Sequence, residues 1–120
     1  MTQAPANLPR EHLLELWWLL EPERCRSIQG NLRVLVSSRW FVLDTHPEVL
    51  QLAVEQAVVE RGWRLLHYYD KGRAHRWIVE FPCGSGYQVF LTEGDQPDAT
   101  LLQAYLAAVE AFQKFQSSLS

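Results

Sequence analysis

The spacing of apolar residues along the chain predicts three helices. The first is the leucine-rich stretch 8–20, which is followed at once by a proline-containing segment. Thr45 and Glu48 have the spacing of a capping box, which opens a second helix that ends at Gly62. Asp98 is a favourable cap for the third helix, whose apolar residues recur at helical spacing as far as Phe115.

Alternating apolar and polar residues, rich in β-branched and aromatic types, predict strands between these helices. Residues 32–43 form either one long strand or two strands joined at Ser37 and Ser38. The segment from Pro22 to Ile28 is expected to be a short helical turn rather than a strand. Three more strands are expected at Trp63–Tyr69, His75–Phe81 and Tyr87–Thr92.

These elements predict an α+β fold in which helices pack on a mainly antiparallel sheet of four or five strands, in the order α-β-α-β-β-β-α. A chain of 120 residues can bury a core of its own. We therefore expect a single domain over residues 1–120, frayed at 1–7 and 117–120. The order of elements is loosely similar to that of small α/β sandwich chaperones and adaptors, with no shared motif.

The register of the last three strands decides which side chains face outward. If Tyr69 lies opposite Ala74, and Phe81 opposite Tyr87, strand alternation separates a core face from an outer face. The core face then carries Leu66, Tyr68, Trp77, Val79, Phe81, Tyr87, Val89 and Leu91. Three apolar residues are left side by side on the outer face: Leu65, Ile78 and Phe90. Such a belt is rarely bare, so the N-terminal helix, a second copy or another protein should cover it.

The first predicted helix has apolar residues on more than one side, including Trp17 and Trp18. Buried aromatic residues tend to dominate interface energies, so these two tryptophans join the belt as candidate interface residues. The sequence thus favours a non-catalytic protein-interaction module, either an adaptor or assembly factor or a self-associating protein. We expect the partner to be another protein or the chain itself, with a homodimer preferred.

Charge suggests an alternative function. Eleven Lys and Arg residues against 14 Asp and Glu residues give a net charge of −3, unlike a dedicated nucleic-acid-binding protein. Basic residues nevertheless concentrate between Arg61 and Arg76, where they alternate with aromatic side chains. A hairpin of this composition suits phosphate contacts and base stacking. The alternative is nucleic-acid binding through Arg64, Lys71, Arg73 and Arg76.

Residues with catalytic or metal-binding chemistry are few and scattered. Cys83 lies in a glycine-rich loop between two strands, which is not the context of a nucleophile elbow. His67 and His75 are suitable zinc ligands, but no paired-ligand motif is present and the expected register points them to opposite faces. His75 opposite Glu93 is the one acid–imidazole contact expected, and we interpret it as an ion pair. We therefore expect no enzyme activity, cofactor or metal.

Hydropathy also bears on location. The longest nearly apolar run, residues 13–20, is far shorter than the ~20 residues that cross a bilayer. Residues 1–9 lack the basic and apolar regions of a signal peptide, so we expect a cytoplasmic protein with no membrane partner. Its two cysteines are accordingly expected to be free thiols.

Overall fold

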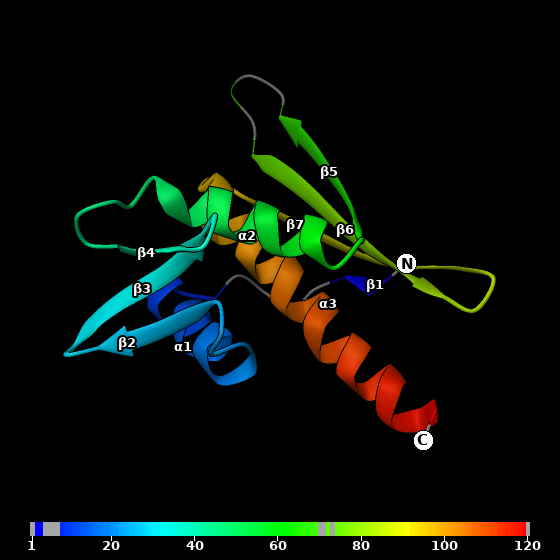
Figure 1. Ribbon diagram of the computed structural model, residues 1–120. Helices are drawn as coiled ribbons and strands as arrows, with labels where there is room; N and C mark the ends of the chain where they lie inside the picture. The colour runs from blue at the N-terminus through cyan, green and yellow to red at the C-terminus, as the bar shows by residue number, and fades with distance from the viewer. Residues whose placement is uncertain (1, 4–7, 70–71, 73, 120) are drawn as a thin grey trace.

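The computed structural model of the chain describes residues 2–3, 8–69, 72 and 74–119, and in this part it contains three helices and two sheets (Figure 1). The helices are α1 (Arg10–Leu20), α2 (Val49–Glu60) and α3 (Pro97–Leu119). The strands are β1 (Thr2–Gln3), β2 (Cys25–Ile28), β3 (Asn31–Val36), β4 (Arg39–Val42), β5 (Arg64–Tyr69), β6 (His75–Cys83) and β7 (Gly86–Gly94). The predicted α+β class is confirmed.

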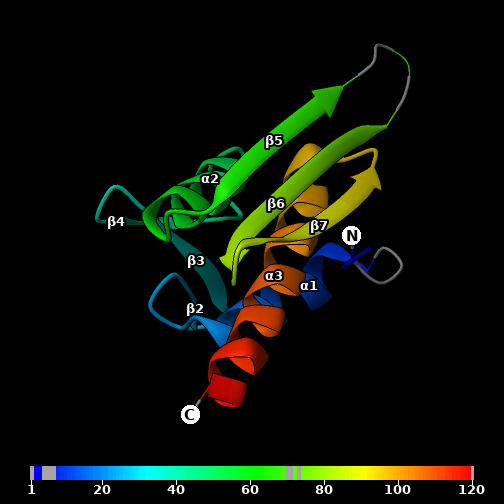
Figure 2. The same cartoon turned by 90° about the vertical axis from the view of Figure 1, so that its right-hand side faces the viewer.

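The strands form two sheets rather than the single sheet that the sequence predicts. Strands β5, β6 and β7 are antiparallel, and the two-residue β1 pairs in parallel with β7 to give the order β1-β7-β6-β5. The antiparallel order β2-β3-β4 makes the second sheet. Helix α3 packs on β6 and β7, α2 on α3 and β3, and α1 on α3 and β2. Figures 1 and 2 show α3 running through the centre of this arrangement.

The expected helical turn over 22–28 is wrong, because part of that segment is strand β2. Of the two alternatives for residues 32–43, the structure shows the two strands, β3 and β4. Two tight turns explain both. Gln29 and Gly30 have φ values of 53° and 80°, and Ser37 and Ser38 have φ values of 51° and 68°. Two consecutive positive φ values characterise the two-residue turns that match the twist of antiparallel strands. Residues 25–42 therefore form a meander of three strands.

The register expected for β5, β6 and β7 is wrong by one residue in both hairpins. Tyr69 lies opposite His75, not Ala74, because the loop is one residue longer than expected. Phe81 lies opposite Gln88, not Tyr87, because the chain reverses over a two-residue turn whose first residue, Gly84, has a φ of 63°. Since side chains alternate between faces, a slip of one residue turns every side chain of β5 and β7 over relative to β6.

The corrected register defines the core. Trp77, Val79 and Phe81 of β6 are buried, and their neighbours on the same face are Leu65 of β5 and Phe90 of β7. Five residues that were expected on this core face lie on the other one: Leu66, Tyr68, Tyr87, Val89 and Leu91.

Aromatic side chains join this sheet to α3. The Phe81 ring centroid lies 5.3 Å from those of both Trp63 and Phe112, and the Trp63 and Phe112 centroids are 5.4 Å apart. Tyr105 extends the cluster, with its ring centroid 6.0 Å from that of Trp63. These rings fix α3 over the core face.

The helix ends differ from the predicted caps. Thr45 does not cap α2: its hydroxyl donates to the Val42 carbonyl at 3.2 Å, and α2 begins only at Val49. The Asp98 carboxylate lies in the first turn of α3, where it accepts a hydrogen bond from Ala99 N–H at 2.8 Å. Helix α3 extends to Leu119.

A buried carboxylate connects the three helices. Glu21, at the end of α1, is 2% exposed. Its Oε1 accepts hydrogen bonds from Trp17 Nε1 at 2.9 Å and from the Tyr105 hydroxyl at 2.7 Å, and its Oε2 is paired with the Arg61 guanidinium. Burial, followed by the charge of Glu21, raises the pKa of Tyr105 above its ordinary value of 10.0, so the phenol remains a donor. Glu21 therefore holds α1 and the end of α2 against the middle of α3.

Replacing Glu21 by Ala should lower the free energy of unfolding by about 2–4 kcal/mol, because the half-buried Arg61 guanidinium and two donors lose their acceptor. Urea unfolding followed by tryptophan fluorescence measures this loss. Glu15→Ala, at an exposed position of the same helix, should change stability by no more than about 0.5 kcal/mol. Equal effects of the two substitutions would show that the Glu21 network does not hold the helices together.

Candidate interaction surface

A regular arrangement of side chains covers the face of the β5–β6–β7 sheet that points away from α3. Its central row consists of Leu66, Ile78 and Leu91, which lie directly opposite one another across the three strands. Leu66 is 36% exposed and the other two are half-buried. We call this the leucine face. In Figure 2, the three strands lie on one side of α3. Helix α3 contacts the core face of this sheet, and the leucine face is the other face.

Ion pairs border the central row on both sides. Toward one end, Arg64 Nε lies 3.3 Å from Glu80 Oε2, and the Arg64 guanidinium stacks over the Tyr87 ring at 5.0 Å from its centroid. Toward the other end, Arg76 Nη2 lies 2.8 Å from Glu93 Oε1. The leucine face thus carries an apolar row between two neutralised pairs of charges.

The predicted apolar belt does not exist as a continuous surface. Leu65 is half-buried against the core and Phe90 is 3% exposed, so only Ile78 of the three points outward. Trp17 is fully buried, whereas Trp18 is 41% exposed on the other side of α1. Leu66 and Leu91 take the places that were assigned to Leu65 and Phe90. The sequence signal for Leu91 was Gly84, which favours a two-residue turn between β6 and β7 and with it the observed register of that hairpin.

The basic residues of the nucleic-acid alternative divide into two groups. Arg64 and Arg76 lie on the leucine face, and both are paired with carboxylates there. Lys71 and Arg73 lie outside the described residues. The two arginines of this hairpin that the structure describes are therefore neutralised by carboxylates of the same chain.

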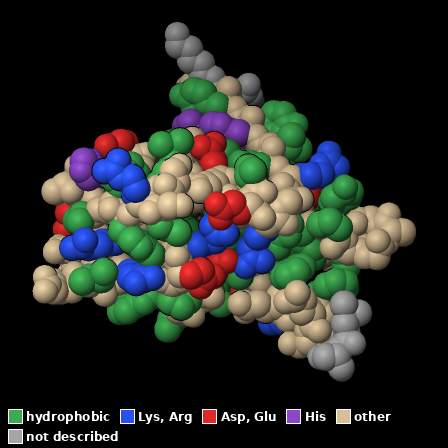
Figure 3. Space-filling model, in the orientation of Figure 1, with side chains coloured by type: hydrophobic (Ala, Val, Ile, Leu, Met, Phe, Trp, Pro, Cys, Tyr) green, Lys and Arg blue, Asp and Glu red, His purple; other side chains and the backbone are tan. Residues whose placement is uncertain are grey.

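Four stacked rings extend from the core along the projecting β5–β6 hairpin. His67 lies flat on Trp77, with 3.8 Å between centroids and an interplanar angle of 1°, and His75 stacks on Tyr69 at 4.2 Å. His67 Nε2 and His75 Nδ1 are 2.9 Å apart, so one ring donates a hydrogen bond to the other. Contrary to the sequence expectation, the two histidines share a face. Figure 3 shows histidine side chains on this face near the projecting hairpin.

The electrostatics of this pair favour the neutral form of His67. Partial burial lowers the pKa of His67 below its ordinary value of 6.5, and the charge of His75 lowers it further, while Glu55 of α2 opposes the shift. His75 lies opposite Gly94 rather than opposite Glu93 as expected, and Glu93 pairs with Arg76. In the part of the chain that the structure describes, no three His, Cys, Asp or Glu residues gather where they could hold a metal ion.

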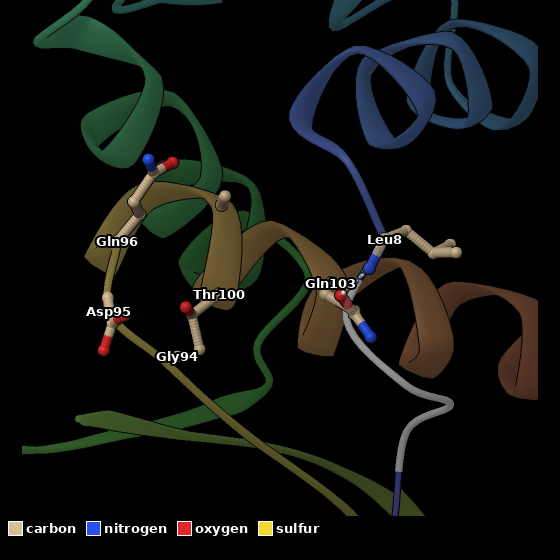
Figure 4. A pocket seen from close by; sticks show the side chains of 7 residues that line it. Leu8, Gly94, Asp95, Gln96, Thr100 and Gln103 are labelled. Atoms are coloured by element: carbon tan, nitrogen blue, oxygen red, sulfur yellow. Dashed lines mark hydrogen bonds between the residues drawn. The ribbon is translucent and has the colours of Figure 1, made fainter.

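A cavity of about 260 Å³ lies between the start of α3 and the residues before α1 (Figure 4). The Leu8 N–H donates to Gln103 Oε1 at 3.0 Å across one side of it. Asp95, Gln96 and Thr100 contribute to its lining. Asp95 is the one ionisable side chain among its described lining residues, so the lining does not form an acid–base pair.

Both cysteines are free thiols, and they differ in how deeply they are buried. Cys25 is buried on β2, where its Sγ lies 3.7 Å from the Leu14 carbonyl oxygen, and burial raises the pKa of its thiol to about 12. Cys83 is half-buried at the end of β6, beside the Gly84 turn. Because its raised pKa keeps the Cys25 thiol protonated, Cys25 is a poor nucleophile and serves as a core side chain.

Comparison of the chain with family models, with curated proteins and with solved structures finds no match. None of the helices in the described part of the chain is long and apolar enough to cross a membrane. The functional proposal therefore rests on the surfaces themselves.

The lowered pKa of His67 predicts a pH-dependent stability. Because the folded state favours neutral His67, its full contribution is present above pH ~6.5 and is lost as the pH falls through the folded-state pKa. Urea unfolding at pH 7.5 and 5.5 should show a larger loss for the natural chain than for His67→Phe, which keeps a ring on Trp77. His12→Gln, at an exposed position of α1, should retain the natural pH dependence. The same loss in His67→Phe would contradict this assignment.

Proposed function

We propose that the chain is a non-catalytic protein-interaction module that associates with a second copy of itself through the leucine face. The observation that carries the proposal is the row formed by Leu66, Ile78 and Leu91 on a sheet face against which α3 does not pack. Apolar side chains gathered on one face are usually covered in a functional assembly. The β5–β6–β7 sheet offers a regular antiparallel surface of the kind that packs against a second sheet.

The charges on this face are complementary to those of a second copy. Consider a two-fold axis that runs along the central row, across the strands. It places Ile78 against Ile78 of the second copy and exchanges the two bordering rows. Glu80 of each chain then faces Arg76 of the other, and Arg64 faces Tyr68. A two-fold axis repeats each contact, so the charge match counts twice.

The other simple two-fold arrangement is disfavoured by the same residues. An axis parallel to the strands keeps each row opposite itself, so that Glu80 would face Glu80 of the second copy. Like charges in contact across an interface cost free energy and exclude that geometry. The charge pattern therefore selects one orientation of the dimer.

Sedimentation equilibrium tests the dimer. The natural chain should sediment as a dimer, and Ile78→Glu should sediment as a folded monomer, since the introduced charge meets its own copy at the centre of the interface. Val59→Glu introduces the same charge at a position of α2 that is 67% exposed, and it should remain dimeric. A natural chain that is monomeric at high micromolar concentration would refute the proposed self-association.

A charge exchange tests the orientation. Glu80→Arg and Arg76→Glu should each weaken the dimer, because each places like charges across the interface. The double variant Glu80→Arg/Arg76→Glu should bind more tightly than the sum of the two single losses predicts, since opposite charges face each other again across the axis. Its recovery is partial, because the exchange also places like charges beside Arg64 and Glu93 within each chain. Additive weakening in the double variant would show that these side chains do not meet across a two-fold axis.

A further inference from the structure

Two arginines stand directly opposite each other on the β2–β3–β4 sheet. Arg26 of β2 pairs in register with Arg33 of β3. Like charges in directly opposed positions of an antiparallel pair are destabilising. The Nε atoms of both side chains are buried, and neither has a hydrogen-bond partner within the described residues. The sheet thus holds two cations together with buried donors that the described chain leaves unused.

This arrangement is unusual within the protein. Five other arginines form ion pairs with carboxylates: Arg10 with Asp98, Arg24 with Glu60, Arg61 with Glu21, Arg64 with Glu80, and Arg76 with Glu93. Arg26 and Arg33 make no such pair in the described part of the chain. Because an unpaired, partly desolvated guanidinium is costly, the pair is better explained by an anion that comes from outside.

Apolar and aromatic side chains surround the two arginines. The Arg26 guanidinium lies over the Trp40 ring, 4.1 Å from its centroid, which holds the planar group in place. Leu35 and Val42 are half-buried on the same face by strand alternation. We call this the arginine face. Beside it, an open hollow is lined by Arg26, by the exposed Trp18 of α1 and by Glu23.

The helices leave the arginine face uncovered. Cys25 and Val34, which are fully buried, point to the opposite side of the sheet, where Cys25 touches the Leu14 carbonyl of α1. In Figure 1, the β2–β3–β4 sheet stands at the side of the molecule, with α1 behind it. Figure 3 shows Lys and Arg side chains interleaved with hydrophobic ones over the same region.

We infer that the arginine face is a docking surface for an acidic, amphipathic segment of a partner protein. A carboxylate of the segment accepts hydrogen bonds from the terminal Nη groups of Arg26 and Arg33 and so offsets the repulsion between the two guanidinium groups. Apolar side chains of the same segment pack on Trp40, Leu35 and Val42. This surface lies on a different sheet from the leucine face and does not depend on the proposed dimer.

The charge pattern favours an acidic protein segment over nucleic acid. Nucleic-acid affinity at physiological salt requires several phosphate contacts, whereas this face offers two guanidinium groups set among apolar side chains. The chain as a whole carries a net charge of −3. A mixed surface of two cations and an apolar rim instead matches a partner that has carboxylates and apolar residues on one side.

A pair of synthetic peptides tests the inference. The first is a fluorescein-labelled twelve-residue peptide with Glu and Leu on one face, and the second carries Gln in place of each Glu. In fluorescence anisotropy with the full chain, the Glu peptide should bind at least about tenfold more tightly than the Gln peptide, since charge-assisted hydrogen bonds are lost with the carboxylates. Its affinity should also fall as salt is added.

Variants locate the binding. Arg26→Gln and Arg33→Gln should each weaken binding of the Glu peptide about tenfold. Arg39→Gln is the matched control, because Arg39 is exposed on the same sheet but stacks over Phe41 on the other side of β4, and it should bind like the natural chain. Ile78→Glu should also bind normally, so a failed dimer and a failed docking surface are distinguished.

Three outcomes would overturn the inference: equal affinity for the Glu and Gln peptides, no binding of the Glu peptide, or tighter binding of a twelve-nucleotide single-stranded DNA. Stability separates loss of binding from loss of folding. Arg33→Gln removes the like-charge contact and keeps the stack of Arg26 on Trp40, so its urea midpoint should be equal to or above that of the natural chain. A lower midpoint would mean that the two arginines stabilise the free chain, contrary to the inference.

Discussion

The arrangement of this protein depends on one buried carboxylate. Glu21 accepts hydrogen bonds from Trp17 and Tyr105 and pairs with Arg61, so that one side chain joins the end of α1, the end of α2 and the middle of α3. Removing a carboxylate from such a site leaves buried donors and a cation without a partner, which is why the network must form as a unit. It gathers the helices into one layer between the two sheets.

Because both sheets pack on the same helices, each sheet has one face that the helices do not cover. Each sheet uses one face for the core, through Val79 and Phe81 in one sheet and Val34 in the other. The opposite face of each is left to the solvent or to a partner. The two free faces differ in chemistry. The leucine face carries an apolar row between neutral ion pairs and suits a second copy, whereas the arginine face carries unpaired cations and suits an acidic segment. A dimer formed through the first would present the second twice.

The sequence predicted the helices and most strands because their signals are local. Apolar spacing located α2, and the strands β5, β6 and β7 lie close to their expected positions. The register failed because it depends on turn length, and a difference of one residue at Gly84 or before His75 reverses the faces. Strand β2 was missed, and residues 32–43 were left as one strand or two, because Gln29, Ser37 and Ser38 adopt positive φ values that these residue types seldom take.

The surfaces were harder to predict than the fold. Leu66 and Leu91 were assigned to the core only because the register was shifted, so the idea of an apolar outer face was retained with different residues. The pairing of Arg26 with Arg33 escaped notice because Arg26 was expected in a helical turn rather than in a strand beside Arg33. Two partners of Glu21, Arg61 and Tyr105, are 40 and 84 residues away along the chain. No local pattern reveals such contacts.

Covalent trapping at the centre of the leucine face tests the account most directly. In a Cys83→Ser chain, Ile78→Cys places a thiol where the proposed two-fold axis passes, while Cys25 remains buried in the core. Because facing sheets lie ~10 Å apart, beyond the reach of a disulfide, a short bismaleimide that bridges two thiols should convert this variant into a crosslinked dimer that retains the natural fold. Val59→Cys in the same background should stay uncrosslinked. A thiol at position 78 that fails to crosslink, or crosslinks no faster than one at position 59, would contradict self-association through this face.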